Sequence, residues 1–285
     1  MRIARFLLLF AALFLLFCSC GSEIYSAVEP GGMQVHFIDV GQADCTLIRT
    51  ADAVILVDAG DGDPARADAL VRYLRKMRID KVDCLILTHP HADHIGGAAE
   101  ILREFSVSEC WMLNAVVEEP MFGELLSALS AEGCPVTEAF RGQTHSFGAL
   151  SVSVLSPDVM STDPLNDKSL VLHVSFHENT LLLPGDISAQ TEEELVEIYG
   201  ADGLSAGILK AAHHGSHLSS SDAFLDAVSP TYTVLSCAEE NAYGYPSADL
   251  LQRFWQREIK VLRTDLDGTV VFFCDGVSYR LLSGN

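Results

Sequence analysis

The sequence predicts an α+β domain in which two β-sheets pack face to face and helices cover their outer surfaces. Apolar, strand-like runs dominate the chain in two clusters, and segments of helical period lie between them. The first three runs are joined by short polar turns, whereas a doubly wound parallel sheet needs a helix after nearly every strand. Strands are expected at residues 35–40, 45–49, 54–58, 84–88, 110–113, 150–155, 170–176, 180–183, 207–212, 232–237, 260–263, 269–274 and 277–281.

Helices are expected after the third strand and between the later strands. Asp63 followed by Pro64 is typical of a helix start. The carboxylate can accept hydrogen bonds from the free N–H groups of the first turn, and proline has no N–H group that would lack a partner there. Ser247 is the expected cap of a later helix, and its apolar residues Leu250, Phe254 and Trp255 are expected in the core. The helices after the first are expected at residues 95–105, 123–131, 191–199, 222–228 and 248–257.

The composition limits the classes of function. The chain has 285 residues, 49% of them hydrophobic, which is enough for one large domain with a good core. It carries 18 basic and 39 acidic residues, and its net charge of −21 argues against a broad electrostatic grip on nucleic acid. Cleavage of a nucleic acid stays open, because bound metal ions supply local positive charge.

The N-terminus has the pattern of a targeting segment. Arg2 and Arg5 flank the start of an apolar run at 6–17, which is too short for a comfortable membrane span and typical of a signal peptide. Cys20 resembles the lipidated cysteine of a bacterial lipoprotein, although Phe17 stands where an aliphatic residue is usual. Free secretion and an uncleaved anchor are the alternatives.

We therefore expect a signal peptide at 1–19, a tether at 20–32 and the folded domain at 33–283. The domain is expected outside the cytoplasm, anchored to the outer face of the cell membrane through a lipid on Cys20. The sequence indicates no protein partner. Buried thiols are the expected state of the domain's cysteines, with a disulfide left open, because they lie mostly in strand-like runs without a C-x-x-C pair.

The run at residues 88–94, Thr-His-Pro-His-Ala-Asp-His, indicates a metal site. Imidazole and carboxylate ligands together suit zinc, manganese or iron. His89 and His91 are two apart, so on an extended backbone their side chains lie on one side and can bind one ion. Asp93 and His94 follow the turn and can bind a second. Two ions roughly 3.5–4 Å apart stabilise both the attacking and the leaving oxygen of a hydrolysis.

Four further polar clusters, at 37–44, 55–60, 182–186 and 209–216, each follow an apolar strand-like run. A single Asp-Gly pair is an ordinary turn pattern. Strand ends that meet at one rim can nevertheless converge on one pocket, and the histidine-rich run makes convergence the better interpretation.

These motifs, in this order, resemble the metallo-β-lactamase superfamily, and they are most similar to the extracellular hydrolase domain of ComEC-type DNA-uptake proteins. The segments at 37–44, 213–216, 243–246 and 263–269 carry the resemblance, which covers residues 33–282. It implies a four-layer αββα sandwich with the metal ions at one edge of the sheets.

The resemblance also implies roles for individual residues. The implied metal ligands are His89 and His91 for one ion, Asp93, His94 and His213 for the other, and Asp186 between them. His214 is the implied substrate contact, with the reverse assignment of the two adjacent histidines left open. Asp58 resembles the carboxylate that orients a histidine ligand.

A metal-bridging water would ionise near neutral pH, and Asp93 or Asp186 could accept its proton. Lys210, His214 and Ser216 could then stabilise the developing oxyanion. The catalytic candidates are therefore Asp93, His214 and Lys210. The candidates for supporting a ligand or contacting substrate are Asp39, Asp44, Asp58, Asn166, Ser169, Ser216 and Tyr245.

Two departures from the superfamily pattern affect the chemistry. Many members have another histidine for the first ion, but Asn166 and Ser169 stand at the matching place, as in the ComEC branch. Oxygen-rich coordination shifts the preference from zinc toward manganese. Tyr245 stands where that branch often has histidine, which would change the choice of substrate or weaken the activity.

The leading hypothesis is a metal-dependent hydrolase with two divalent ions, zinc or manganese, that cleaves phosphodiester bonds, DNA among its substrates. A cell-wall phosphodiesterase of the phosphorylcholine type, or another ester hydrolase, is the first alternative. A β-lactamase fits less well, because that group's third histidine is missing. An inactive binding domain is the alternative from another class.

Overall fold

The computed structural model describes residues 24, 27–115, 117–161 and 164–283. The expected signal peptide at 1–19 and the first part of the expected tether lie outside these residues. Within the described ranges, every helix is too short or too polar to span a bilayer.

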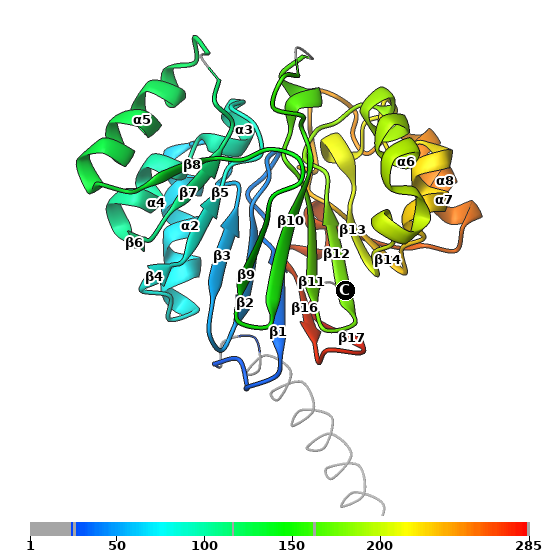
Figure 1. Ribbon diagram of the computed structural model, residues 1–285, viewed down its shortest axis with the longest axis horizontal. Coiled ribbons are helices and arrows are strands. Elements are labelled where there is room, and N and C mark those ends of the chain that lie inside the picture. Colours follow the sequence, from blue (N-terminus) through cyan, green and yellow to red (C-terminus); the bar gives the residue numbers. More distant parts are fainter. Residues whose placement is uncertain (1–23, 25–26, 116, 162–163, 284–285) are drawn as a thin grey trace, which may run out of the picture.

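Two mixed sheets stand face to face, and helices flank both of them, so the molecule has four layers (Figure 1). The strands of the first sheet are β1 (Met33–Phe37), β2 (Thr46–Thr50), β3 (Val54–Val57), β5 (Cys84–Ile86), β7 (Cys110–Met112), β8 (Val136–Glu138), β16 (Val270–Cys274) and β17 (Tyr279–Ser283). Their order is β17–β16–β1–β2–β3–β5–β7–β8. The strands from β3 to β8 run parallel, so their carboxyl ends lie along one edge.

The second sheet is antiparallel at one side and parallel at the other. Its strands are β9 (Thr144–Phe147), β10 (Leu150–Ser156), β11 (Val171–Phe176), β12 (Asn179–Leu183), β13 (Ile208–Lys210), β14 (Tyr232–Leu235) and β15 (Lys260–Arg263), in the order β15–β14–β13–β12–β11–β10–β9. The strands from β12 to β15 are parallel, and the segments that follow them reach the same rim as those of the first sheet.

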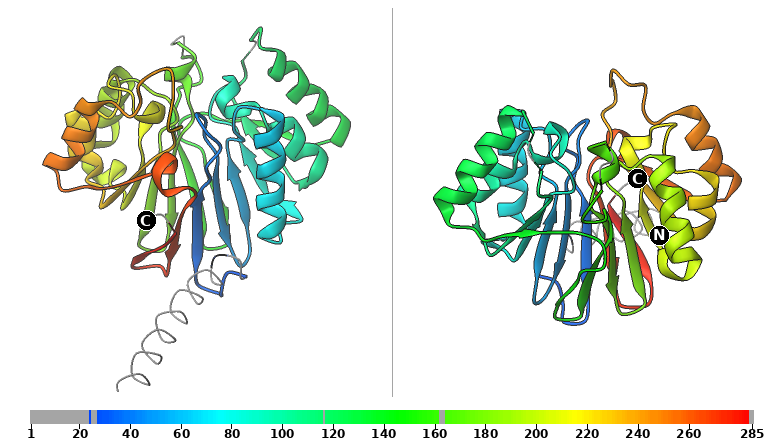
Figure 2. Two further views of the ribbon diagram at one scale, coloured as in Figure 1. Left: turned by 180° about the vertical axis from the view of Figure 1, so that it is seen from behind. Right: turned by 45° about the horizontal axis from the view of Figure 1, so that its top comes forward.

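The helices on the side of the first sheet are α2 (Pro64–Lys76), α4 (Ala98–Glu104) and α5 (Pro120–Glu132), and those on the side of the second are α6 (Ala189–Leu204), α7 (Asp222–Val228) and α8 (Ala248–Gln256) (Figures 1 and 2). The short α3 (Ala92–Ile95) lies at the upper rim of Figure 1 and α9 (Thr264–Asp267) follows β15. The expected caps are confirmed: the Asp63 carboxylate accepts from the N–H groups of residues 65 and 66, and the Ser247 hydroxyl accepts from that of Leu250.

Three apolar layers hold the sandwich together. The central layer lies between the sheets and includes Val35, Phe37 and Ile208. The outer layers join each sheet to its helices, for example through Leu74 on α2 and Phe224 on α7. The fold class predicted from the alternation of strands and helices is therefore confirmed.

Details of the predicted elements differ from the structure. Each expected strand is present, but the short strands β4 (Lys81–Val82), β6 (Ser106–Val107), β8 and β9 were not predicted. The single helix expected at 95–105 is wrong, because a break at Gly96 and Gly97 separates α3 from α4. A Cβ on Gly96 would lie 2.2 Å from the carbonyl carbon of Asp61, so only glycine permits this approach of the metal loop to its neighbour.

Two side-chain predictions have different outcomes. The placement of Trp255 in the core is wrong, since it is 78% exposed, whereas Leu250 and Phe254 are fully buried. The six cysteines of the domain are all buried and free, as expected for thiols in apolar strands. Burial raises the pKa of several of them, including Cys237, whose pKa rises to about 12.

Candidate metal centre

The histidine-rich loop begins where β5 ends and turns directly into α3. His91 keeps an extended backbone at the start of this helix, so the first two histidines precede it, while Asp93 and His94 lie on it. The rim loops fix α3 in place: the N–H of Asp44 donates to the carbonyl of Asp93 at 3.0 Å, and the N–H of Ala59 donates to that of His94 at 2.8 Å.

Four buried side chains meet at this rim. Asp44, His94, Asp186 and His214, which we call the metal-rim cluster, each offer one atom, and these atoms lie within 4.8 Å of one another. They come from the segments that follow β1, β5, β12 and β13, with His94 on α3, so both sheets contribute to the cluster. The predicted convergence of distant strand ends is what the structure shows for these four segments.

A hydrogen-bonded frame orients His94. The Asp58 carboxylate lies 2.8 Å from Nδ1 of His94 and also accepts from the N–H and the hydroxyl of Thr88, each at 2.8 Å. Because a carboxylate accepts, Nδ1 carries the proton, and Nε2 faces Asp186 at 3.4 Å. Asp58 lies where the resemblance would place an orienting carboxylate. Thr88, which sequence reasoning did not single out, completes the frame.

A backbone carbonyl orients His214 in the same way. Nδ1 of His214 donates to the carbonyl of Ser236 at 3.0 Å, which leaves Nε2 facing Asp93 at 3.3 Å and Asp186 at 3.6 Å. Sequence reasoning could not single out the carbonyl of Ser236, because every residue has a backbone carbonyl.

The atoms that point into the cluster have no hydrogen-bond partners among the described residues. They are Nε2 of His94, Nε2 of His214, Oδ1 of Asp186 and Oδ1 of Asp44. Buried polar atoms are nearly always paired, so several unpaired atoms in one place call for an explanation. Ring nitrogens that face carboxylate oxygens are stable together when a cation lies between them. The donor set therefore fits a divalent metal ion.

The electrostatics of the cluster follow from the same geometry. Burial opposes a proton on His94, but Asp186 and Asp58 outweigh it and hold the pKa of His94 well above its ordinary range. Burial likewise opposes ionisation of Asp186, but His94 and His214 hold its pKa well below the ordinary range. The carboxylates that favour a proton on His94 would equally attract a metal ion, and an ion bound at Nε2 would replace that proton, because a ligand nitrogen must be unprotonated.

Lys210 lies beneath the cluster and is 3% exposed. Its ammonium group forms an ion pair with the carboxylate of Asp44. Burial would lower the pKa of Lys210, but Asp44 and Asp186 raise it, so the side chain stays charged. Lys210 is therefore fixed on Asp44, and its predicted contact with an oxyanion stays a prediction.

The adjacent histidines His213 and His214 occupy a strained turn, in which both have a left-handed backbone with φ of 51° and 54°. The turn presents both rings to Asp186. Nε2 of His213 lies 3.9 Å from the Asp186 carboxylate and its ring is partly exposed, whereas His214 is buried in the cluster. This geometry favours His214 as a ligand of the cluster and leaves His213 closer to solvent. The reverse assignment was the one preferred from the sequence.

His89 and His91 form a second pair of nitrogens. Nε2 of His89 and Nδ1 of His91 lie 3.0 Å apart, so one ion could bind both. Burial holds the pKa of His89 well below its ordinary value, which keeps the ring neutral as a ligand must be. The hydroxyl of Ser169 lies 3.3 Å from Nδ1 of His89. Asn166 offers a buried side-chain oxygen without a hydrogen-bond partner in the described part of the chain.

The remaining candidates lie around this centre. Asp93 is about one third exposed, and its carboxylate is the most open acidic group near the cluster. Asp39 is exposed and accepts from the N–H of Gly41 at 3.2 Å, so its side chain shapes a turn. The Ser216 hydroxyl is buried and accepts from the N–H of Leu218 at 3.2 Å. The ring of Tyr245 lies 6.0 Å from that of His213.

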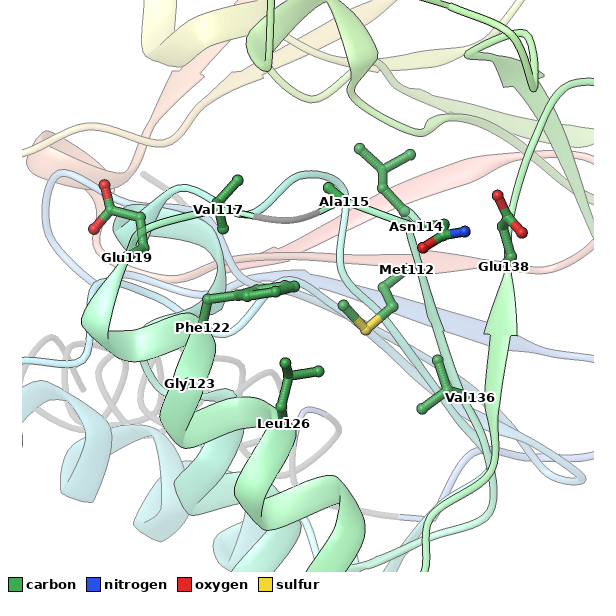
Figure 3. A pocket seen from close by; sticks show the side chains of 11 residues that line it. Met112, Asn114, Ala115, Val117, Glu119, Phe122, Gly123, Leu126, Val136 and Glu138 are labelled. Atoms are coloured by element: carbon green, nitrogen blue, oxygen red, sulfur yellow. The ribbon is translucent and has the colours of Figure 1, made fainter.

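An apolar groove, which no residue of the metal-rim cluster lines, lies beside α5 (Figure 3). Its volume is about 550 Å³, and α5 and β8 form its walls. Met112 and Phe122 line both this groove and a small crevice that reaches His89 and Pro90. The groove therefore lies behind the first pair of histidines and is not the place where the ligand atoms converge.

Comparison with known proteins identifies the relatives of this chain. The profile of the Metallo-beta-lactamase superfamily matches residues 38–239. ComE operon protein 3 of Bacillus subtilis is 30% identical over 265 residues, which cover 87% of this chain and 34% of that protein. Competence protein ComA of Neisseria gonorrhoeae is 33% identical over 246 residues, or 86% of this chain and 33% of that protein. The chain thus spans about a third of the length of these curated relatives.

Solved structures show the same fold at low sequence identity. The metallo-beta-lactamase fold protein YhfI from Bacillus subtilis has a TM-score of 0.59 and 14% identity, covering 85% of this chain and 99% of that one. Tm1679, described as a metal-dependent hydrolase of the beta-lactamase superfamily, has a TM-score of 0.52 and 14% identity, covering 87% and 98%. With its αββα sandwich and its buried His/Asp cluster, this chain belongs to the metallo-beta-lactamase superfamily of metal-dependent hydrolases.

Proposed function

We propose that this protein hydrolyses phosphodiester bonds with the help of two divalent metal ions. The observation that carries the proposal is the set of unpaired, buried ligand atoms in the metal-rim cluster, next to the facing nitrogens of His89 and His91. One ion would be held by His89 and His91, and the other by the metal-rim cluster. The relative named competence protein ComA, and the resemblance to DNA-uptake proteins, favour nucleic acid as the source of the phosphodiester.

Such ions would supply Lewis-acid stabilisation of a phosphoryl oxygen and lower the pKa of water. The protein's own residues do the rest. Asp58 and Thr88 fix the ring of His94, and Lys210 offsets the charge of Asp44. Burial opposes the charge of Asp93, but the hydrogen bond from His214 lowers its pKa, so this carboxylate, the acidic group most open to solvent, stays ionised and can accept a hydrogen bond from an attacking water.

The choice of metal follows from the absence of a further histidine beside His89 and His91. Asn166 and Ser169 stand where many superfamily members have one, and the Ser169 hydroxyl lies at Nδ1 of His89, the ring nitrogen that faces away from His91, so oxygen or water would complete the ion's coordination. Hard oxygen ligands favour manganese over zinc at this position. We therefore propose manganese or zinc, with manganese giving the higher activity.

We also propose that the protein acts outside the cytoplasm, tethered to the membrane by a lipid on Cys20. The motif at the N-terminus supports this location. Mass spectrometry of the mature protein checks it, since a diacylated N-terminal cysteine is expected and an intact Met1 would contradict it.

The full chain, purified in mild detergent, tests the activity directly. It is titrated with zinc or manganese, its bound metal is measured, and it is offered single-stranded DNA, duplex DNA and bis(p-nitrophenyl) phosphate. Hydrolysis of the small diester and of at least one DNA form is expected, and His91→Ala should abolish both. Absence of metal binding would contradict the enzyme proposal. Hydrolysis of the small diester alone would contradict DNA as the substrate and favour the cell-wall alternative.

A further inference from the structure

A row of aromatic rings leads from the metal centre to the open surface. Nε2 of His213 lies 3.9 Å from the carboxylate of Asp186. The ring of Tyr245 meets that of His213 edge to face, with centroids 6.0 Å apart. The ring of Tyr243 stacks on that of Tyr245 at 5.5 Å and an angle of 19°. Tyr243 is 69% exposed, so the row ends in an aromatic ring that faces solvent.

One asparagine fixes the loop that carries these tyrosines. The Asn241 side-chain oxygen accepts from the N–H groups of Tyr243 at 3.2 Å and Tyr245 at 2.9 Å. Its NH₂ group donates to the carbonyls of Ala238 at 2.9 Å and Tyr245 at 2.6 Å. All the polar capacity of this side chain thus holds the loop in one shape. The stacked pair is therefore preorganised, and an exposed aromatic pair held in this way is suited to binding.

The same loop is docked on the turn that carries the adjacent histidines. The N–H of Ser247 donates to the carbonyl of Gly215 at 2.9 Å. A Cβ on Gly215 would lie 2.7 Å from Cβ of Pro246, so the two loops are in direct contact. The position of the tyrosines relative to the metal centre is therefore set by packing and not by the loop alone.

Two cationic side chains near this rim, Lys210 and Arg263, are already paired with carboxylates. Lys210 is buried and paired with Asp44. Arg263, the last residue of β15, is paired with Asp265 through two hydrogen bonds. The chain as a whole has a net charge of −21. Stacking is less affected by this charge than phosphate contacts are, and it is worth about 1–3 kcal/mol for each base on an aromatic side chain.

We propose that Tyr243 and Tyr245 form a stacking subsite that selects phosphodiesters with a flat ring, such as a nucleobase, beside the scissile phosphate. The inference rests on the proposed phosphodiesterase function and names the substrate group that this function prefers. It predicts that the enzyme binds its substrate through one base stacked beside the metal centre, and not through contacts along the backbone of a long nucleic acid. Binding is then weakly dependent on salt, unlike that of proteins that neutralise many phosphates.

Two esters with the same leaving group test the subsite. The 2,2,2-trifluoroethyl ester of thymidine 5′-monophosphate carries a base on the retained side, whereas methyl 2,2,2-trifluoroethyl phosphate carries no flat ring, and ¹⁹F NMR follows the trifluoroethanol that both release. The quantity to compare is the ratio of their kcat/KM values. In Tyr243→Ala this ratio is expected to fall about tenfold, mainly through the KM of the thymidine ester. Tyr243→Phe should keep the ratio, because the ring and not the hydroxyl stacks.

Trp255→Ala is the matched control, since it removes an aromatic ring that is 78% exposed on α8. Its ratio should equal that of the wild type. An unchanged ratio in Tyr243→Ala would overturn the proposal. So would a larger kcat/KM for an ester that carries a hexose in place of thymidine, because the subsite would then be a carbohydrate site.

A binding measurement separates failure of the subsite from failure of the proposed function. If neither ester is hydrolysed, the phosphodiesterase proposal fails, and calorimetric titration with thymidine 5′-monophosphate decides the subsite. Binding to the wild type about tenfold tighter than to Tyr243→Ala would support the stacking subsite. Equal affinity for both proteins, or no binding to either, would overturn it.

Discussion

Two groups of polar side chains, one on a face of the first sheet and one at the rim to which both sheets contribute, differ in how their atoms are paired. On the face of the sheet that α2 covers, Gln34, His36, Arg49 and Tyr73 form what we call the strand-face network. The guanidinium of Arg49 donates to Oε1 of Gln34 at 2.9 Å and to the carbonyls of Met77 and Ile24. The rings of His36 and Tyr73 are joined by a 2.7 Å hydrogen bond.

In the metal-rim cluster, by contrast, ring nitrogens and carboxylate oxygens face one another without partners. Both groups are buried, so burial alone does not distinguish a structural group from a binding site. A network whose atoms are paired within the fold stabilises the fold. A buried cluster whose polar atoms converge without partners indicates a binding site for an ion or ligand that the polypeptide does not supply.

Asp186→Asn should give the largest effect and tests the assignment of the metal-rim cluster. The amide has the same shape but cannot bind two cations as a carboxylate does. Phosphodiesterase activity is expected to fall about a thousandfold, with loss of bound metal measured on the same sample. Asp202→Asn, at an exposed site on α6, should keep wild-type activity. Activity within tenfold of wild type in Asp186→Asn would remove this residue from the centre.

Arg49→Met should instead act on stability. It removes a buried guanidinium and leaves the oxygen of Gln34 and the carbonyl of Met77 without this donor, so unfolding should need about 3 kcal/mol less free energy. Urea denaturation measures the change. Activity per folded molecule should stay at the wild-type level.

Arg72→Met is the control for this change, because Arg72 forms an exposed ion pair with Asp68 on α2. Such pairs contribute about 0–1 kcal/mol. Equal destabilisation by the two substitutions would show that the strand-face network has no special role in the fold.

The sequence predicts the sheets and the metal loop because both depend on local patterns. Alternating apolar strands and the closely spaced histidines are visible without any tertiary contact. The unpredicted strands β4 and β6 have two residues each, too few for a period to show. Trp255 was misplaced because periodicity gives the apolar face of a helix but not where the neighbouring layer ends.

Distant contacts explain what the sequence leaves open at the site. Nothing in the adjacent pair His213 and His214 tells which ring turns inward, since the answer depends on the left-handed turn and on the carbonyl of Ser236. Asp44 was expected to support a ligand or contact substrate. Its place in the cluster, paired with Lys210, depends on a contact between the two sheets.

Metal binding should sharpen the comparison between the two groups. Zinc or manganese at about a hundred times its dissociation constant should raise the free energy of unfolding by about 2.7 kcal/mol. The part of this stabilisation that comes from the ion of the metal-rim cluster is expected to disappear in His94→Ala, whereas Tyr73→Phe, which alters only the strand-face network, should keep all of it. Thermal unfolding with and without metal measures it. Stabilisation of His94→Ala equal to that of the wild type would place the ion elsewhere.

The last prediction concerns the strand-face network and pH. Burial, with the nearby charge of Arg49, lowers the pKa of His36 from 6.5 to about 3. As pH falls below 6.5, His36 becomes protonated in the unfolded chain but stays neutral in the folded protein. His36 therefore leaves the free energy of unfolding unchanged above pH 6.5. As pH falls from 6.5 toward 3, it lowers this free energy by up to about 1.4 kcal/mol per pH unit.

Other histidines titrate in the same range, so the difference between variants isolates this contribution. Burial also lowers the pKa of His89, which acts in the same direction, whereas the raised pKa of His94 acts in the opposite one. His36→Gln should flatten the dependence of unfolding free energy on pH between 6.5 and 3, and His217→Gln, at an exposed loop site, should leave it unchanged. Parallel profiles for wild type and His36→Gln would mean that His36 is charged in the folded protein. In that case the strand-face network would hold an unpaired charge, and its contrast with the metal-rim cluster would no longer stand.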